Sequence, residues 1–112
     1  MEIVDIFKSL ADETRIRMLN LLRYGEICVC DIEEVLGIQQ SNASRHLNKL
    51  KQFGIIVSKK KSQWVYYQFN QELLIKYPFL AMIINDEVKK ISICEQDSIK
   101  LIKHKESKTV CV

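Results

Sequence analysis

The hydrophobic pattern of this chain changes its period at Gly54. Before this glycine, apolar residues recur at helical spacings of three and four, for example at Ala43, Leu47 and Leu50. After it, the segments IIVSKK and WVYYQF are rich in β-branched and aromatic residues, which favour strands. The short joint KSQ predicts a hairpin, although it lacks the Gly, Asn or Asp typical of tight turns. The chain is therefore expected to combine a helical body with one β-hairpin.

Four helical segments are expected before the hairpin. Residues 2–10 place their apolar side chains on one helix face. Asp12 is a plausible N-cap for a second helix, which Gly25 ends. Residues 31–36 predict a short third helix, and Ser41 is placed to cap a fourth.

The rest of the chain predicts further helix. Pro78 suits the first turn of a strongly apolar fifth helix that reaches Ile91, and the tail continues as helix to about Lys103. The predicted fold is mostly α with a small β-hairpin, a winged helix-turn-helix of about five to six helices. A DNA-binding domain is expected over 1–94 and a partly flexible C-terminal extension over 95–112.

Charge is distributed unevenly along the chain. The net charge is +3, yet residues 35–71 hold six basic residues and no acidic one. Such a stretch favours a polyanionic partner, although a solvated surface with chance clustering would give the same count. The amphipathic N-terminus does not resemble a signal peptide, and no apolar run approaches the length of a membrane span. We therefore expect a cytoplasmic protein with reduced thiols and no membrane partner.

The second helix of a helix-turn-helix enters the major groove of double-stranded DNA. Asn and Gln can pair with adenine, Arg with guanine, and Ser with phosphate. The alternative is that these polar side chains form only the solvated face of a helix, and His46 beside them is expected to be packed or to contact phosphate. The candidate base and phosphate contacts are Gln40, Ser41, Asn42, Ser44, Arg45 and Asn48 in the helix, and Lys59, Lys60 and Lys61 in the hairpin.

A pair of cysteines precedes the third helix. In a helix, residues two apart point about 200° away from each other, whereas in extended backbone they share a face. If Asp31 caps the helix, Cys28 and Cys30 lie outside it and their sulfurs can converge. The nearby helix N-terminus would favour the thiolate that soft ions bind. The alternative is that both cysteines are small buried apolar residues.

Two segments resemble the ArsR family of bacterial repressors. They are LADETRIRMLNLL and EICVCDIEEVLGIQQSNASRHLNKLKQFGIIVSKKKSQWVYYQFN, which together cover roughly residues 9–70. The resemblance implies a homodimer, joined through its first and last helices, that binds an inverted-repeat operator. It also implies an inducer that releases the repressor from DNA. The Cys-Val-Cys-Asp element resembles that of members that sense arsenite, antimonite, cadmium or lead.

The chain departs from the best-known arsenic pattern of that family. Glu33 occupies the position of a third cysteine, so a third thiolate would come from Cys94 or Cys111. A site with two thiolates would favour an organoarsenical, and one with three would favour As(III) or Sb(III). We expect no required cofactor and an inducer of this class, with Cd(II) or Pb(II) as alternatives.

Three other functions are weighed against metalloid sensing. In a redox-responsive repressor, Cys94 or Cys111 would be the disulfide partner, because a disulfide between residues two apart is strained. Zinc or nickel sensing would use Asp86, Glu87 and His104, but no close His pair exists. An enzyme or metal carrier is disfavoured because the chain has no catalytic histidine near the cysteines and no phosphate loop.

Overall fold

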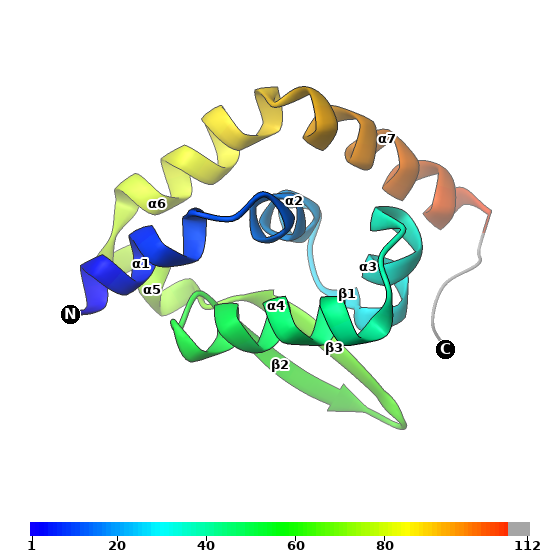
Figure 1. Cartoon of the computed structure of the whole chain (residues 1–112), viewed down its shortest axis with the longest axis horizontal. Helices are drawn as coiled ribbons and strands as arrows, with labels where there is room; N and C mark the ends of the chain where they lie inside the picture. Colours follow the sequence, from blue (N-terminus) through cyan, green and yellow to red (C-terminus); the bar gives the residue numbers. More distant parts are fainter. Residues whose placement is uncertain (108–112) are drawn as a thin grey trace.

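The computed structural model describes residues 1–107. Figure 1 shows α2 near the centre, with α6 and α7 arching along one side and α4 and the hairpin along the other. No helix in residues 1–107 is long and apolar enough to cross a membrane. The elements in chain order are α1 (Glu2–Leu10), α2 (Glu13–Leu22), β1 (Ile27–Cys28), α3 (Val29–Leu36), α4 (Gln40–Gln52), β2 (Ile56–Lys61), β3 (Trp64–Phe69), α5 (Gln71–Lys76), α6 (Pro78–Met82), the π-helical η1 (Ile83–Glu87), the 3-10 helix η2 (Val88–Lys90) and α7 (Ser92–Glu106).

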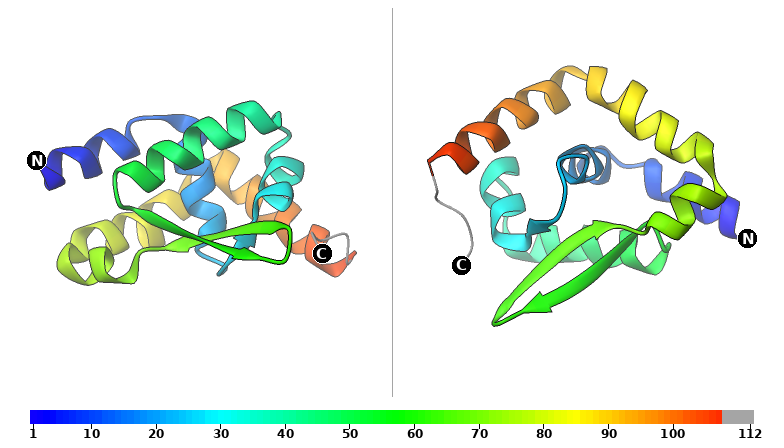
Figure 2. Two further views of the ribbon diagram at one scale, coloured as in Figure 1. Left: turned by 90° about the horizontal axis from the view of Figure 1, so that it is seen from below. Right: turned by 180° about the vertical axis from the view of Figure 1, so that it is seen from behind.

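The predicted hairpin is confirmed, and it belongs to a sheet of three strands. The strand order is β1-β3-β2, and both neighbouring pairs are antiparallel. Strand β1 was not predicted, because a strand of two residues has no periodicity to detect. Ser62 adopts a φ of 60°, so the turn is made without glycine. The hairpin tip projects away from the helical body (Figure 2).

Local signals at the helix ends are mostly confirmed. The carboxylate of Asp12 caps α2 by accepting a hydrogen bond of 3.1 Å from the backbone N–H of Arg15. Gly37 ends α3 in a left-handed conformation with a φ of 65°. The predicted cap by Ser41 is wrong: α4 begins at Gln40, and its first turn closes through the bond from the Ala43 N–H to the Gln39 carbonyl.

One hydrophobic core joins the helices to the base of the sheet. Met18 and Leu21 of α2 are completely buried in it. Ala43, Leu47 and Leu50 of α4 are also completely buried, as the sequence predicts. This inward face leaves the opposite side of α4 to solvent.

The C-terminal helices differ from the prediction. Pro78 opens α6 as expected, but the helical path passes through η1 and η2 and breaks at Ile91, whose ψ of 129° is extended. Helix α5 was not predicted, because six residues between the hairpin and Pro78 are too few to show a helical period. Helix α7 packs on α2 and α3 and runs to Glu106, through the expected boundary at residue 94. That boundary stays a prediction.

The Asp12 cap gives a first testable prediction. Replacing Asp12 with alanine is expected to lower the free energy of unfolding by about 1 kcal/mol, because the backbone N–H of Arg15 loses its acceptor. Urea denaturation followed by circular dichroism measures this. The Asp12→Asn variant keeps the acceptor oxygen and should retain most of the stability. Equal losses in the two variants would mean that the carboxylate charge, rather than the cap, stabilises the helix.

Candidate nucleic-acid interface and cysteine site

The outer face of α4 carries the predicted base-reading residues. Gln40, Ser41, Arg45 and Asn48 are exposed, and Asn42 and Ser44 are partly exposed. The Nη2 of Arg45 donates a hydrogen bond of 2.8 Å to Oδ1 of Asn42. The guanidinium is therefore already aligned along the exposed face of the helix.

His46 lies on α4 next to this face, but it is buried. Its Nδ1 lies 3.4 Å from Nη1 of Arg15, and its Nε2 lies 3.3 Å from Nη2 of Arg45. Burial lowers the pKa of His46, and the two arginines lower it further, although the carboxylate of Asp12 opposes them. His46 is therefore a packed, neutral side chain at neutral pH, the first of the two predicted alternatives.

The hairpin presents the predicted lysines in two different states. Lys59 and Lys60 are exposed on β2. Lys61 forms an ion pair with Glu26, and its ammonium lies 5.0 Å from the ring centroid of Tyr66. Contact between Lys61 and a phosphate therefore competes with an existing partner, whereas Lys59 and Lys60 have their ammonium groups in solvent.

The two sulfurs of the cysteine pair converge as predicted. Cys28 Sγ lies 3.1 Å from Cys30 Sγ. However, the prediction that both cysteines lie outside the helix, capped by Asp31, is wrong. Cys28 is the extended N-cap of α3, held by β pairing with Tyr66, and Cys30 lies in the first helical turn. One extended residue is enough to bring the two sulfurs to the same side.

The electrostatics of Cys28 differ from the prediction. Burial raises the pKa of the Cys28 thiol, which is 1% exposed. Backbone N–H groups of Cys30 and Asp31 at the helix N-terminus lower it, as the sequence predicts, but the carboxylates of Asp31 and Glu33 raise it again. Cys28 is therefore a protonated thiol at neutral pH, and a ligand must displace its proton to bind.

The structure does not bring Cys94 to this pair. Cys94 is completely buried in α7, and its backbone carbonyl accepts a hydrogen bond of 2.9 Å from Nδ2 of Asn20. Within residues 1–107, no three His, Cys, Asp or Glu side chains are close enough to hold one metal ion. That statement covers the alternative zinc ligands Asp86, Glu87 and His104. Cys111 lies outside the described residues.

One contact near the cysteines was missed by the sequence analysis. Nε2 of His104, in the last turn of α7, lies 2.7 Å from Oδ1 of Asp31 in α3. The two side chains are 11% and 13% exposed. Asp31 directly follows Cys30, so this contact joins α7 to the turn that holds the sulfurs. No local pattern in the sequence could reveal a pair that depends on how two helices pack.

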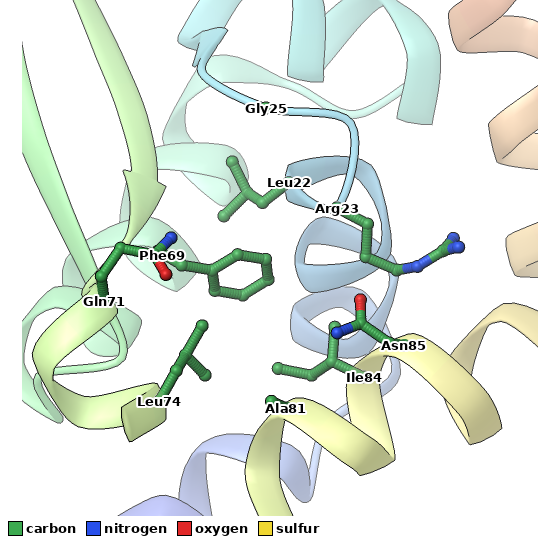
Figure 3. A pocket seen from close by; sticks show the side chains of 9 residues that line it. All are labelled: Leu22, Arg23, Gly25, Phe69, Gln71, Leu74, Ala81, Ile84 and Asn85. Carbon is green, nitrogen blue, oxygen red and sulfur yellow. The ribbon is translucent and has the colours of Figure 1, made fainter. Parts of the chain in front are cut away.

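A pocket between α2 and the segments that follow β3 is separate from both sites. It has a volume of about 260 Å³. Figure 3 shows side chains of α2, β3, α5 and α6 pointing into it, while the guanidinium of Arg23 points away. Its lining residues include neither cysteine of the pair and none of the predicted DNA contacts. They are Leu22, Arg23, Gly25, Phe69, Gln71, Leu74, Ala81, Ile84 and Asn85.

The fold and the outer face of α4 define a winged helix-turn-helix protein of the DNA-binding type. A solved structure with this fold is the homodimeric winged helix-turn-helix DNA-binding domain (fragment 1–100) of Mb0332 from Mycobacterium bovis, a possible ArsR-family regulator. It superimposes with a TM-score of 0.65 and 22% identity over 81% of this chain and 85% of that domain. At this identity, the likeness concerns the fold alone.

Sequence comparison identifies the family. Residues 12–58 match the arsR family of bacterial regulatory proteins. The arsenical resistance operon repressor of Escherichia coli K12 is 37% identical over 100 residues, which are 88% of this chain and 80% of that protein. The arsenic resistance transcriptional regulator ArsR1 of Pseudomonas putida is 46% identical over 69 residues. These residues are 61% of this chain but only 54% of the length of ArsR1. The chain belongs to the ArsR family.

Proposed function

We propose that this chain is a homodimeric transcriptional repressor that trivalent arsenic or antimony releases from its operator. The observation that carries the proposal is the pair of sulfurs, Cys28 Sγ and Cys30 Sγ, 3.1 Å apart at the start of α3. The relatives in Escherichia coli and Pseudomonas putida, which are named as arsenic resistance regulators, support it.

The chemistry of the site suits a soft, thiophilic ion. In the reduced protein, two sulfurs on one side of the backbone would replace two oxygen ligands of As(III) or Sb(III), and each thiol proton would leave with the displaced hydroxide as water. An arsenical with one organic substituent has two such positions and needs no further protein ligand. Cadmium and lead are the alternative inducers, and they also bind thiolates.

The position of the sulfurs links the ligand to DNA. Cys30 lies in α3, and only the turn at residues 37–39 separates α3 from α4. A ligand that closes on Cys28 and Cys30 fixes the first turn of α3 and so changes how α3 supports α4. A coupling of about 1–3 kcal/mol between the two sites would lower operator affinity about 5- to 150-fold.

The exposed apolar residues support the homodimer. Val4 and Phe7 of α1 and Met82 of α6 are exposed, and Phe7 stacks on Phe79 with 5.7 Å between ring centroids. Exposed apolar side chains thus occur on both the N-terminal helix and the helix after Pro78, and the stack of Phe7 on Phe79 joins the two helices. A second copy that covers this surface would place two α4 helices on the two halves of an inverted repeat.

Cys28→Ser tests the inducer site. The variant should bind operator DNA within about twofold of the wild-type affinity, because Cys28 does not lie on the exposed face of α4, and arsenite should no longer release it. Fluorescence anisotropy with a labelled operator, in the presence of a phosphine reductant, measures both properties. Methylarsenite, antimonite, cadmium, lead and zinc should be titrated in parallel to rank the inducers.

Cys94→Ser is the matched control, because it removes another buried thiol that lies apart from the pair. It should still be released by arsenite. Release of Cys28→Ser at the wild-type arsenite dose would show that the inducer binds elsewhere. In a separate titration without the reductant, release by mild peroxide but not by arsenite would instead favour the redox-responsive repressor.

A further inference from the structure

His46 is a buried residue of α4 whose two ring nitrogens contact different parts of the molecule. It is 4% exposed, although it directly follows Arg45, one of the predicted DNA contacts. Its Nε2 lies 3.3 Å from Nη2 of Arg45. Its Nδ1 lies 3.4 Å from Nη1 of Arg15 and 3.7 Å from Oδ1 of Asp12. The ring therefore connects the N-terminal end of α2 to the exposed face of α4.

The neighbours of the neutral ring determine which nitrogen carries its proton. Arginine offers only N–H donors, so an imidazole nitrogen can bond to Arg15 or Arg45 only when it carries no proton itself, and a neutral ring has one such nitrogen. The carboxylate of Asp12 faces Nδ1 and favours a proton there. Within residues 1–107, the hydrogen-bond partner of Nε2 is Arg45, which cannot accept a proton. The proton is therefore favoured on Nδ1, and Nε2 accepts a hydrogen bond from Arg45.

Arg15 is held in place by bonds that do not involve His46. Its Nε donates a hydrogen bond of 3.0 Å to the carbonyl of Ser9, and its Nη2 donates one of 3.0 Å to the carbonyl of Lys8. Its backbone N–H donates to the carboxylate of Asp12 at 3.1 Å. The end of α1 and the start of α2 thus form a fixed support for the imidazole.

Two acceptors hold the guanidinium of Arg45. Nη2 donates a hydrogen bond of 2.8 Å to Oδ1 of Asn42 and lies 3.3 Å from Nε2 of His46. An NH₂ group has two hydrogens and can serve both acceptors. Nε and Nη1 have no partner among residues 1–107, so their N–H groups remain available to DNA. A side chain that is already held in the free protein loses less conformational entropy on binding.

We propose that His46 is a positioning residue for Arg45: its unprotonated Nε2 holds the guanidinium in the orientation that reads the operator, and Asp12 keeps the proton on Nδ1. This inference rests on the proposed function, because it requires Arg45 to contact the operator. It adds a buried residue with no contact to DNA to the residues that determine specificity.

A double-mutant cycle in the full-length, reduced protein tests the proposal. The probe is a labelled duplex that the wild-type protein selects from a random-sequence pool, and random DNA is the reference. His46→Leu fills the buried space without an acceptor and should lower the preference for the selected duplex about fivefold for each half-site. In the Arg45→Ala background, the same substitution should change the preference by less than about twofold, since the side chain that it positions is absent. Equal effects in the two backgrounds would overturn the proposal.

His46→Gln and His46→Asn form a matched pair that keeps the test open if His46→Leu folds poorly. The longer amide of glutamine can place an oxygen near the position of Nε2, whereas that of asparagine reaches only the position of Nδ1. His46→Gln should recover the preference to within about twofold of the wild type, and His46→Asn should not. Urea denaturation gives the stability of each variant separately. A preference that followed stability, with no rescue by glutamine, would show a structural role and contradict the proposal.

Long-range proton–nitrogen NMR of the imidazoles observes the tautomer directly. The chain has two histidines, and the signals of His46 are those that disappear in His46→Gln. A protonated Nδ1 and an unprotonated Nε2 are expected in the free protein at neutral pH, and the reverse tautomer would overturn the proposal. An additive cycle in a protein that arsenite still releases would end this inference and leave the proposed function standing. Coupling without release by arsenite would have the opposite meaning: His46 positions Arg45, and the inducer assignment is wrong.

Discussion

Arg17→Met is expected to lower the free energy of unfolding by about 3–5 kcal/mol, the loss typical of removing one partner from a buried ion pair. The Nε and Nη2 atoms of Arg17 bond to both carboxylate oxygens of Asp97, at 2.8 and 2.9 Å. Arg17 is 17% exposed and Asp97 is not exposed at all. Methionine fills much of the same volume but leaves the Asp97 carboxylate without its cation.

Urea denaturation at a fixed protein concentration measures the loss, since the stability of a dimer depends on concentration. The double variant Arg17→Met, Asp97→Leu is the matched control. It removes both charges and should recover most of the stability, because an apolar pair often replaces a buried ion pair at little cost. A loss below about 1 kcal/mol in Arg17→Met alone would show that water enters and solvates Asp97.

The elements that the sequence predicts well are those with a strong local period. The inward face of α4 follows from Ala43, Leu47 and Leu50, and all three are completely buried. The hairpin follows from its β-branched and aromatic residues, and the ladder pairs Ile56 with Phe69. In both cases the residues that form the element also form the core, so the local and the tertiary signals agree.

The elements that the sequence misses have ends set by tertiary packing. Asp31 is of a residue type that often caps helices, yet α3 begins two residues earlier, because β1 pairs Cys28 with Tyr66. The apolar run after Pro78 predicts one helix to Ile91, yet the run contains π and 3-10 segments before α7 begins. Periodicity detects which residues face inward but not where neighbouring elements interrupt a helix.

The candidate site likewise has one part that the sequence predicts and one part that it misses. Convergence of Cys28 and Cys30 is a local property of two residues, and the sequence predicts it even though the helix start is wrong. The contact between Asp31 and His104 joins residues 73 positions apart, so it depends on how α7 packs. Its consequence, a fixed end for α7 beside the sulfurs, becomes visible only in the structure.

Arg45→Ala is expected to weaken operator binding by about 2–6 kcal/mol. A well-oriented arginine that reads guanine contributes about 1–3 kcal/mol, and the proposed dimer presents two copies. Arg45 is exposed on α4, and its bond to Asn42 orients the guanidinium in the free protein. The free energy of unfolding should change by no more than about 0.5 kcal/mol, since the side chain is on the surface.

Lys60→Ala is the matched control for Arg45→Ala, because Lys60 is an exposed cation on the hairpin. If Lys60 contacts phosphate, its loss should weaken operator and random DNA alike and reduce the salt dependence, with a change in the log–log slope of about 0.9 for each contact. Arg45→Ala should instead remove most of the preference for the operator over random DNA. Anisotropy titrations on both duplexes at several salt concentrations distinguish the two. An Arg45→Ala variant that loses equal affinity for both duplexes, with a reduced salt slope, would show that Arg45 binds the backbone and that specificity comes from other residues of α4.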